Sequence, residues 1–301
     1  MADLSLSLCK LKLPNPLVLA SGIRGSNASL LIRAAREGAG AVTSKSCSLH
    51  AREGHANPTA IVHGDVMLNA IGLSNPGVEM EIIEIKKAVA HAGVPVIASV
   101  YANSYEDFAS VASRIAQAKP AMIELDISCP NVQKEGKMFS SSSQDAAQAV
   151  RAAKAKVGNI PLSAKLSPNV PNIGEIAREC QMAGADCISA INTMPAMWID
   201  VHAKRAVLAN KYCGMSGPAL LPVALRCVHE IRNSCSLPII GGGGVICGED
   251  AARMLMAGAN AVSIGSAVWY RKNAFSEIKK ELGIFMEKEG YRKISDIKFI
   301  G

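Results

Sequence analysis

The sequence predicts one (β/α)8 barrel domain over residues 1–301, with a β-hairpin ahead of the first barrel strand. Eight short, continuously apolar runs alternate with helical segments, which is typical of parallel strands buried on both faces. Three junctions, at 36–41, 181–186 and 255–260, share the order helix, glycine, alanine, strand. An open, doubly wound parallel sheet is the alternative architecture.

The elements follow in order along the chain. Residues 4–13 alternate in two short runs and predict the hairpin. We expect helices at residues 28–37, up to residue 91, from the serine run 140–143 to 157, at 173–183, near 249 and at 275–289. Residues 50–66 are rich in His, Pro and Gly, so we expect an irregular excursion over one barrel end there. The eight barrel strands are expected at residues 17–21, 41–46, 95–100, 122–127, 161–166, 187–193, 238–245 and 261–266.

A cysteine lies at the tip of the fourth predicted strand. Pro130 has no N–H for a strand ladder, so the run ISCPN at 127–131 ends the strand. Cys129 is therefore expected at the carboxyl end of a strand, where α/β folds build active sites. A thiolate is a competent general base once its pKa falls toward neutrality. The alternative is that Cys129 is one more small buried residue.

Glycines mark a predicted phosphate site. The run at 241–244 follows the seventh strand, and Gly265-Ser266 ends the eighth. Glycines let backbone N–H groups approach a phosphate closely, and barrels commonly hold phosphate after strands seven and eight. A dinucleotide fingerprint fits less well, because no acidic residue ends a following strand at the required place.

Two lysines and an asparagine are predicted at the same mouth of the barrel. Lys45, Lys165 and Asn192 each lie near the end of a strand. Singly, such residues are usually solvated rim positions. Together they suit an anionic substrate and a cofactor that gains negative charge.

Composition limits the function classes. The formal net charge is +7 and the basic residues are scattered, which favours small anionic ligands over nucleic acid. The nine cysteines include no CxxC pair, so an iron–sulfur cluster or other metal site in this chain is not expected. The N-terminus lacks a secretory pattern and no apolar run reaches membrane-spanning length. These features predict a cytoplasmic protein with reduced thiols and no membrane contact.

The motifs resemble those of dihydroorotate dehydrogenases over residues 4–270. The matching runs are NAIGLSNPG at 69–77, ISCPN at 127–131, KLSPN at 165–169, INT at 191–193, SGPA at 216–219 and the glycine run. The chain is most similar to class 1B catalytic subunits. Class 2 enzymes use a serine base and carry an N-terminal membrane extension, and class 1A enzymes match residues 68–77 less closely.

The resemblance implies an activity and a set of site residues. It implies oxidation of dihydroorotate to orotate in pyrimidine biosynthesis, with Cys129 removing the C5 proton and FMN N5 taking the C6 hydride. The implied FMN-binding residues are Ser21, Lys45, Ser46, Ser99, Asp126, Lys165, Ile191, Gly217, Gly243, Gly244, Gly265 and Ser266. The implied substrate-binding residues are Lys45, Asn69, Ala70, Ile71, Gly72, Leu73, Asp126, Asn131, Asn192 and Thr193.

The resemblance also implies partners. A class 1B catalytic subunit works with a subunit that carries FAD and a [2Fe–2S] cluster, in a homodimer or heterotetramer.

Two positions depart from the family pattern. Asp126 and Ser99 stand where the family has asparagine. A charged carboxylate at 126 would repel an anionic substrate and raise neighbouring pKa values. Two alternatives therefore stay open, a flavin-dependent dehydrogenase of neutral dihydropyrimidines and a non-catalytic scaffold on a degenerate barrel.

Overall fold

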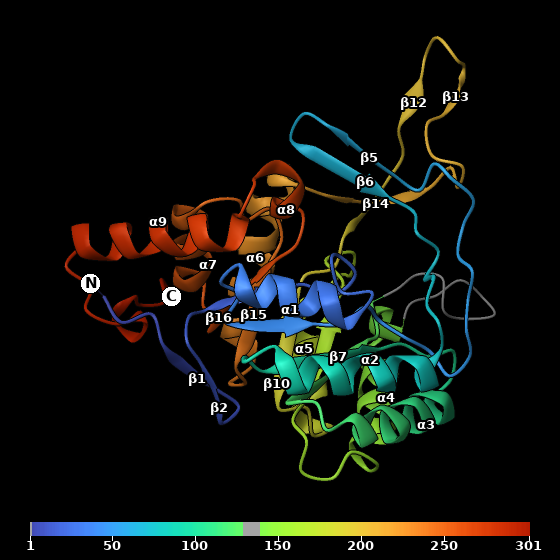
Figure 1. The fold of residues 1–301 in the computed structure, drawn as a ribbon, viewed down its shortest axis with the longest axis horizontal. Helices are drawn as coiled ribbons and strands as arrows, with labels where there is room; N and C mark the ends of the chain where they lie inside the picture. Colours follow the sequence, from blue (N-terminus) through green and yellow to red (C-terminus); the bar gives the residue numbers. More distant parts are fainter. Residues whose placement is uncertain (1, 129–138) are drawn as a thin grey trace.

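The computed structural model describes residues 2–128 and 139–301, in which eight parallel strands close into a barrel (Figure 1). The predicted (β/α)8 architecture is confirmed, because β16 pairs with β3 and no open edge remains between the barrel strands. The strands follow one another around the barrel in chain order. They are β3 (Leu17–Leu19), β4 (Ala41–Thr43), β7 (Val96–Val100), β8 (Met122–Asp126), β9 (Leu162–Leu166), β10 (Cys187–Ala190), β15 (Ile239–Gly242) and β16 (Ala261–Ile264).

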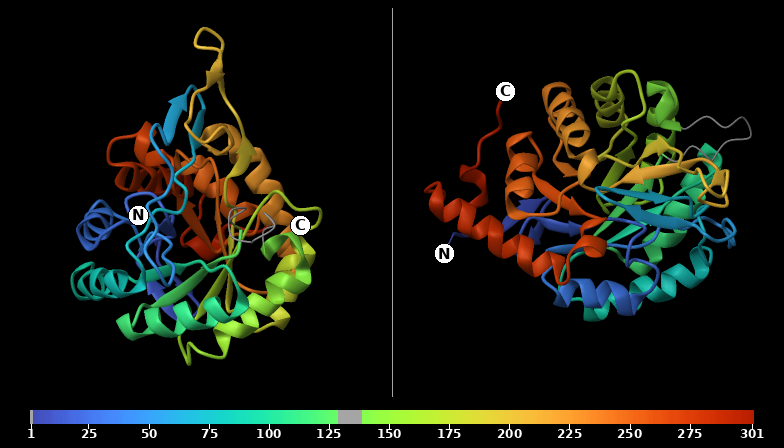
Figure 2. Two further views of the ribbon diagram at one scale, coloured as in Figure 1. Left: turned by 90° about the vertical axis from the view of Figure 1, so that its right-hand side faces the viewer. Right: turned by 90° about the horizontal axis from the view of Figure 1, so that it is seen from above.

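Helices surround the barrel (Figure 2). Each amphipathic helix turns its apolar side inward, as α3 does with Phe108, Val111 and Ile115. Three of them, α3, α6 and the short α8, lie outside the segments predicted from the sequence. The helices are α1 (Ala28–Arg36), α2 (Val78–His91), α3 (Tyr105–Ile115), α4 (Ser143–Lys154), α5 (Ile173–Met182), α6 (Leu221–Ser234), α7 (Gly248–Met256), α8 (Ala267–Tyr270) and α9 (Ala274–Lys288).

Caps and glycines set the ends of these helices. The serine run ends in the N-cap of α4, where Ser142 accepts a hydrogen bond from the backbone N–H of Asp145. The three repeated junctions place Gly38, Gly184 and Gly258 at φ of 109°, 99° and 109°. In each, the alanine after the glycine donates its N–H to the carbonyl five residues earlier, which closes a Schellman turn.

The N-terminal hairpin closes the bottom of the barrel, at the amino ends of its strands. It pairs β1 (Leu6–Leu8) with β2 (Leu11–Leu13), as predicted. Leu8 and Leu13 pack against an apolar cluster that includes Val18, Ile97 and Met122. The opposite, carboxyl end of the barrel is therefore the end left for a site.

A second sheet above the barrel mouth corrects the prediction for residues 50–66. Instead of a wholly irregular excursion, part of that segment joins a four-stranded antiparallel sheet in the order β11-β14-β6-β5. Its strands are β5 (Ala60–His63), β6 (Val66–Asn69), β11 (Met194–Ala196) and β14 (Cys213–Ser216). The alternation of β5 is weak, and β6 pairs with β14 about 145 residues further along the chain, which no local pattern reveals.

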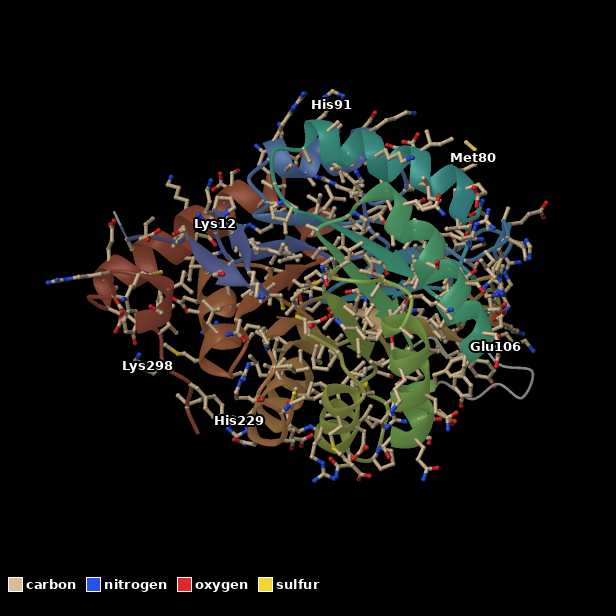
Figure 3. All side chains as sticks on the ribbon, turned by 90° about the horizontal axis from the view of Figure 1, so that it is seen from below. Lys12, Met80, His91, Glu106, His229 and Lys298 are labelled. Atoms are coloured by element: carbon tan, nitrogen blue, oxygen red, sulfur yellow. The ribbon has the colours of Figure 1, made fainter. Side chains whose placement is uncertain are left out.

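Two features lie on the outside. A hairpin of β12 (Ile199–Asp200) and β13 (Arg205–Ala206) projects beyond the second sheet (Figure 2). The outer surface carries polar side chains such as those of Glu106 and His229 and exposed apolar ones such as that of Met80 (Figure 3). Within the described parts of the chain, no helix has both the length and the apolar character needed to cross a bilayer.

Candidate active site at the carboxyl ends of the strands

A cavity of about 780 Å³ opens at the carboxyl end of the barrel, beneath the second sheet. It brings together residues that lie up to 249 positions apart in the sequence, from Ala20 to Trp269. The predicted residues that line it are Ser21, Lys45, Ser46, Asn69, Ala70, Ile71, Gly72, Leu73, Asp126, Lys165, Ile191, Asn192, Thr193, Gly243, Gly244, Gly265 and Ser266.

Two predicted residues, Ser99 and Gly217, do not line the cavity, and two others are not described by the structure. Ser99 does not line the cavity, because it is fully buried behind Ser46 and shares a 2.9 Å hydroxyl hydrogen bond with it. Gly217 lies beside the cavity, next to Ser216, which does line it. Cys129 and Asn131 lie outside the residues that the structure describes.

Lys165 and Glu124 form a buried charged pair at the foot of the cavity. The Lys165 ammonium donates to Ser21 Oγ at 2.8 Å and lies 3.8 Å from Glu124 Oε1. The same carboxylate oxygen accepts from Ser99 Oγ at 3.1 Å. Glu124 was not among the predicted site residues, although an acidic residue between the buried Ile123 and Leu125 is a signal that could have found it.

Asp126 fixes the next group of polar side chains. Its Oδ1 accepts from the backbone N–H of Ser128 at 3.2 Å and from Ser128 Oγ at 2.6 Å. Ser128 Oγ in turn accepts from Asn192 Nδ2 at 2.7 Å, and Asn192 Oδ1 accepts from the N–H of Thr193 at 2.8 Å. The carboxylate at 126 is thus held by its neighbours, and the Asn192 amide has a fixed orientation at the cavity wall.

The glycines after β15 form a narrow cradle. Gly243 and Gly244 have φ of 133° and 80°, which side chains rarely adopt. A Cβ on Gly244 would lie 2.4 Å from the backbone nitrogen of Leu221, and one on Gly243 would lie 2.8 Å from Ala224 Cβ. Only backbone therefore fits between the strand end and α6, with Gly265 and Ser266 alongside in the cavity wall. Such a backbone surface fits a phosphate group.

The loop after β6 supplies the opposite wall. It is held in place by the segment before β5, since the N–H of His55 donates to Ile71 O at 3.0 Å and Arg52 pairs with Asn75 through two backbone bonds. A Cβ on Gly72 would lie 2.6 Å from the His55 nitrogen, so this loop packs tightly against that segment. The backbone of residues 69–73 is therefore fixed above the polar side chains of the barrel.

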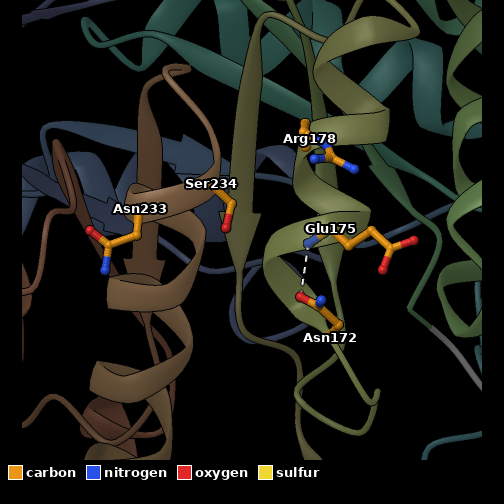
Figure 4. A pocket seen from close by; sticks show the side chains of 5 residues that line it. All are labelled: Asn172, Glu175, Arg178, Asn233 and Ser234. Atoms are coloured by element: carbon orange, nitrogen blue, oxygen red, sulfur yellow. Dashed lines mark hydrogen bonds between the residues drawn. The ribbon is translucent and has the colours of Figure 1, made fainter.

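A second cavity, of about 350 Å³, lies between α5 and α6 (Figure 4). All its lining residues are exposed and hydrophilic, and the Asn172 side chain in it only caps α5 by accepting from the Glu175 N–H at 3.0 Å. It has the character of a solvated helix end. Among the described residues, no group of three His, Cys, Asp or Glu side chains is arranged to hold a metal ion.

One buried carboxyl lies behind the site. Glu81 on α2 is 1% exposed, and neither carboxyl oxygen has a hydrogen-bond partner among the described residues. Burial raises the pKa of Glu81 to about 7, and the charge of Glu84 adds to the rise, while the positive charge of Lys45 opposes it. The fold therefore favours the protonated form of this side chain.

Comparison of the sequence with known proteins identifies one family. The sequence profile of the family described as dihydroorotate dehydrogenase matches residues 3–286. Several relatives carry the name dihydroorotate dehydrogenase B (NAD(+)), catalytic subunit. Those from Pyrococcus abyssi and Methanothermobacter thermautotrophicus are 40% and 43% identical, and each alignment covers 98% of this chain and 97% of the relative. The relative from Methanosarcina mazei is 42% identical over 98% of this chain and 93% of its own length.

Glu81 makes the stability of the protein depend on pH. Its pKa is higher in the folded chain than in the unfolded chain, so its contribution to the free energy of unfolding falls as pH rises from about 4.5 to about 7. As pH rises from 5 to 8, the parent should lose this contribution and Glu81→Gln should not. The free energy of unfolding of the variant, relative to that of the parent, should therefore increase by on the order of 2 kcal/mol. Urea unfolding at both pH values measures this gain. The exposed Glu79→Gln on the same helix is the control, and equal gains in both variants would contradict the prediction.

Proposed function

The chain belongs to the dihydroorotate dehydrogenase family, and from this premise we propose that it is an FMN-dependent class 1B catalytic subunit. As a member, it is an oxidoreductase that oxidises dihydroorotate to orotate in pyrimidine biosynthesis with a flavin. The observation that carries the FMN assignment is one cavity that combines a glycine cradle with a largely buried lysine. The cradle fits a single phosphate, which FMN carries and free riboflavin lacks.

The cavity residues divide into two proposed groups. The first group would hold the phosphate of FMN and consists of Gly243, Gly244, Gly265 and Ser266, with Gly217 beside them. Lys165 would lie against the flavin ring, where a cation stabilises the reduced, anionic form, and Ser21, Lys45, Ser46 and Ile191 would line the rest. When bound, FMN supplies the acceptor for the C6 hydride. Ser99, which is buried behind Ser46, would act on the flavin site only through its neighbours.

The substrate side of the cavity suits a small anion. We propose that the ring and carboxylate of dihydroorotate are held by Lys45, Thr193, the side-chain amides of Asn69 and Asn192, and the backbone of residues 70–73. The resemblance adds Asn131, which lies outside the described residues. Asp126 accepts a hydrogen bond from Ser128 Oγ, and Ser128 Oγ accepts one from Asn192. We therefore expect the Asp126 carboxylate to orient Asn192 through Ser128 and not to repel the substrate directly. Cys129, which follows β8 by three residues in the sequence, would remove the C5 proton as a thiolate.

The cofactor and substrate have a direct spectroscopic test. We expect the purified chain to be yellow, to release about one FMN per chain on acid treatment, and to bleach anaerobically with dihydroorotate. Dihydrouracil, which lacks the carboxylate, should bleach it much more slowly, because Lys45 then loses its partner. Release of FAD, or a colourless protein that takes up no FMN, would refute the cofactor assignment.

Replacement of Cys129 tests the proton acceptor. General-base removal typically slows a reaction by about 10²–10⁴-fold, so we expect that loss in anaerobic flavin reduction by Cys129→Ala, with flavin retained. Cys129→Ser should recover part of the rate at high pH. The matched control is Cys180→Ala, which removes a fully buried thiol on α5 and should lower stability without slowing flavin reduction. An unchanged rate in Cys129→Ala would make Asp126 the next candidate base.

In this proposal, reoxidation of the reduced flavin requires a second protein chain. The relatives are named catalytic subunits of an NAD(+) enzyme, and this sequence has no CxxC pair for a cluster. We expect a partner subunit with FAD and a [2Fe–2S] cluster, in an assembly built on a homodimer or heterotetramer. The isolated chain should then oxidise dihydroorotate with an artificial dye but reduce NAD very slowly. NAD reduction as fast as dye reduction by the chain alone would remove the need for a partner, and rapid turnover with fumarate would indicate class 1A behaviour.

A further inference from the structure

The family resemblance assigned no role to Glu124, which the structure places next to Lys165. Its side chain is only 7% exposed, and that of Lys165 is 13% exposed. Glu124 comes from the middle of β8, and its strand neighbours Ile123 and Leu125 are fully buried in the apolar layer between barrel and helices. Glu124 therefore points the other way, into the barrel, where it lines the cavity floor.

The carboxylate is held from two sides. Ser99 Oγ donates to Oε1 at 3.1 Å, and Ser99 Oγ is itself 2.9 Å from Ser46 Oγ, so the contacts continue to the cavity wall. On the other side the Lys165 ammonium lies 3.8 Å from Oε1 and is tethered at 2.8 Å to Ser21 Oγ. Two opposite charges are thus fixed in a largely buried position by neutral hydroxyl groups.

Packing alone does not account for a charged residue at this position. Removing a carboxylate from water is costly unless a counter-charge and hydrogen bonds compensate, and apolar residues of similar size often fill such positions at least as well. Electrostatic interactions are also stronger here than at the surface, because the surroundings are poorly hydrated. A buried carboxylate so close to a cavity lysine therefore changes the charge that the lysine presents to any ligand.

We propose that Glu124 is a positioning residue that acts as the counter-ion of Lys165 and limits the stabilisation of reduced flavin. The inference rests on the proposed function, since it assumes a flavin in the cavity. Lys165 favours the anionic reduced ring, and Glu124 offsets part of that positive charge while keeping the ammonium in place beside Ser21. The pair thereby keeps the flavin easy to reduce by substrate and still easy to reoxidise.

The test is the reduction potential of the bound flavin in Glu124→Gln. Glutamine keeps the shape and can still accept from Ser99, but it removes the negative charge. The reduction potential of the bound flavin should become more positive than in the parent. When variant and parent are equilibrated with the same reference dye at the same dye ratio, the ratio of reduced to oxidised flavin should be about tenfold higher in the variant. Coulomb's law gives an effect of about this size for the loss of one nearby charge in surroundings with an effective dielectric of about 20. A role in packing alone would not shift the potential in this direction.

Three further variants complete the design. Glu124→Asp keeps the charge and should remain close to the parent. Glu249→Gln is the matched control. Like Glu124, Glu249 is paired with a cationic side chain, that of Arg253 at 3.0 Å, but it is exposed on α7. Its replacement should leave the flavin potential unchanged. Glu124→Met is a second uncharged variant of similar length and should shift the potential in the same direction as glutamine.

The outcomes separate this inference from the proposed function. A parent protein that binds no flavin would refute the proposed cofactor. A parent that binds flavin, with an unchanged or more negative potential in Glu124→Gln, would overturn the counter-ion role alone. Loss of flavin or of folding in both uncharged variants would also overturn it, because Glu124 would then serve binding or folding.

Discussion

Closure of the barrel through the pairing of β16 with β3 is the constraint on which the rest of this structure depends. Because all eight strands are parallel, closure directs every carboxyl end to the same rim. Residues from one end of the sequence to the other then share one cavity. The hairpin seals the opposite end with leucines, so the barrel has an apolar floor and a polar mouth.

The inside of the barrel changes character along the strand direction. Near the amino ends the inward side chains are apolar, such as Ile97 and Met122. Two to four residues further on they are polar, including Ser99, Glu124 and Lys165, and each of these has a hydrogen-bond or ionic partner. Burial makes such pairing necessary, because an unpaired polar group there costs more free energy than a paired one gains. The network is therefore both the wall of the site and part of the core.

The second sheet gives the mouth its upper boundary. Strands inserted after β4 and after β10 meet as β6 and β14, and this pairing covers the rim with Leu68, Ala70 and Leu208 at its centre. The same pairing orients the loop at 69–73 over the polar network. A site formed this way has one wall from the barrel and one from the inserted segments.

The sequence by itself determined the barrel strands and the hairpin, because each depends on local signals, and its resemblance to a known family predicted most of the residues that line the cavity. Continuous apolar runs specify strands buried on both faces, and Gly38, Gly184 and Gly258 specify helix ends that only a left-handed residue allows. Only the tertiary structure decided the second sheet, the place of Ser99 behind Ser46, and the pairing of Glu124 with Lys165. These features depend on contacts between segments far apart in the chain. The partner of a buried charge is fixed by the strands that barrel closure places next to it, and local periodicity in the sequence does not reveal which strands those are.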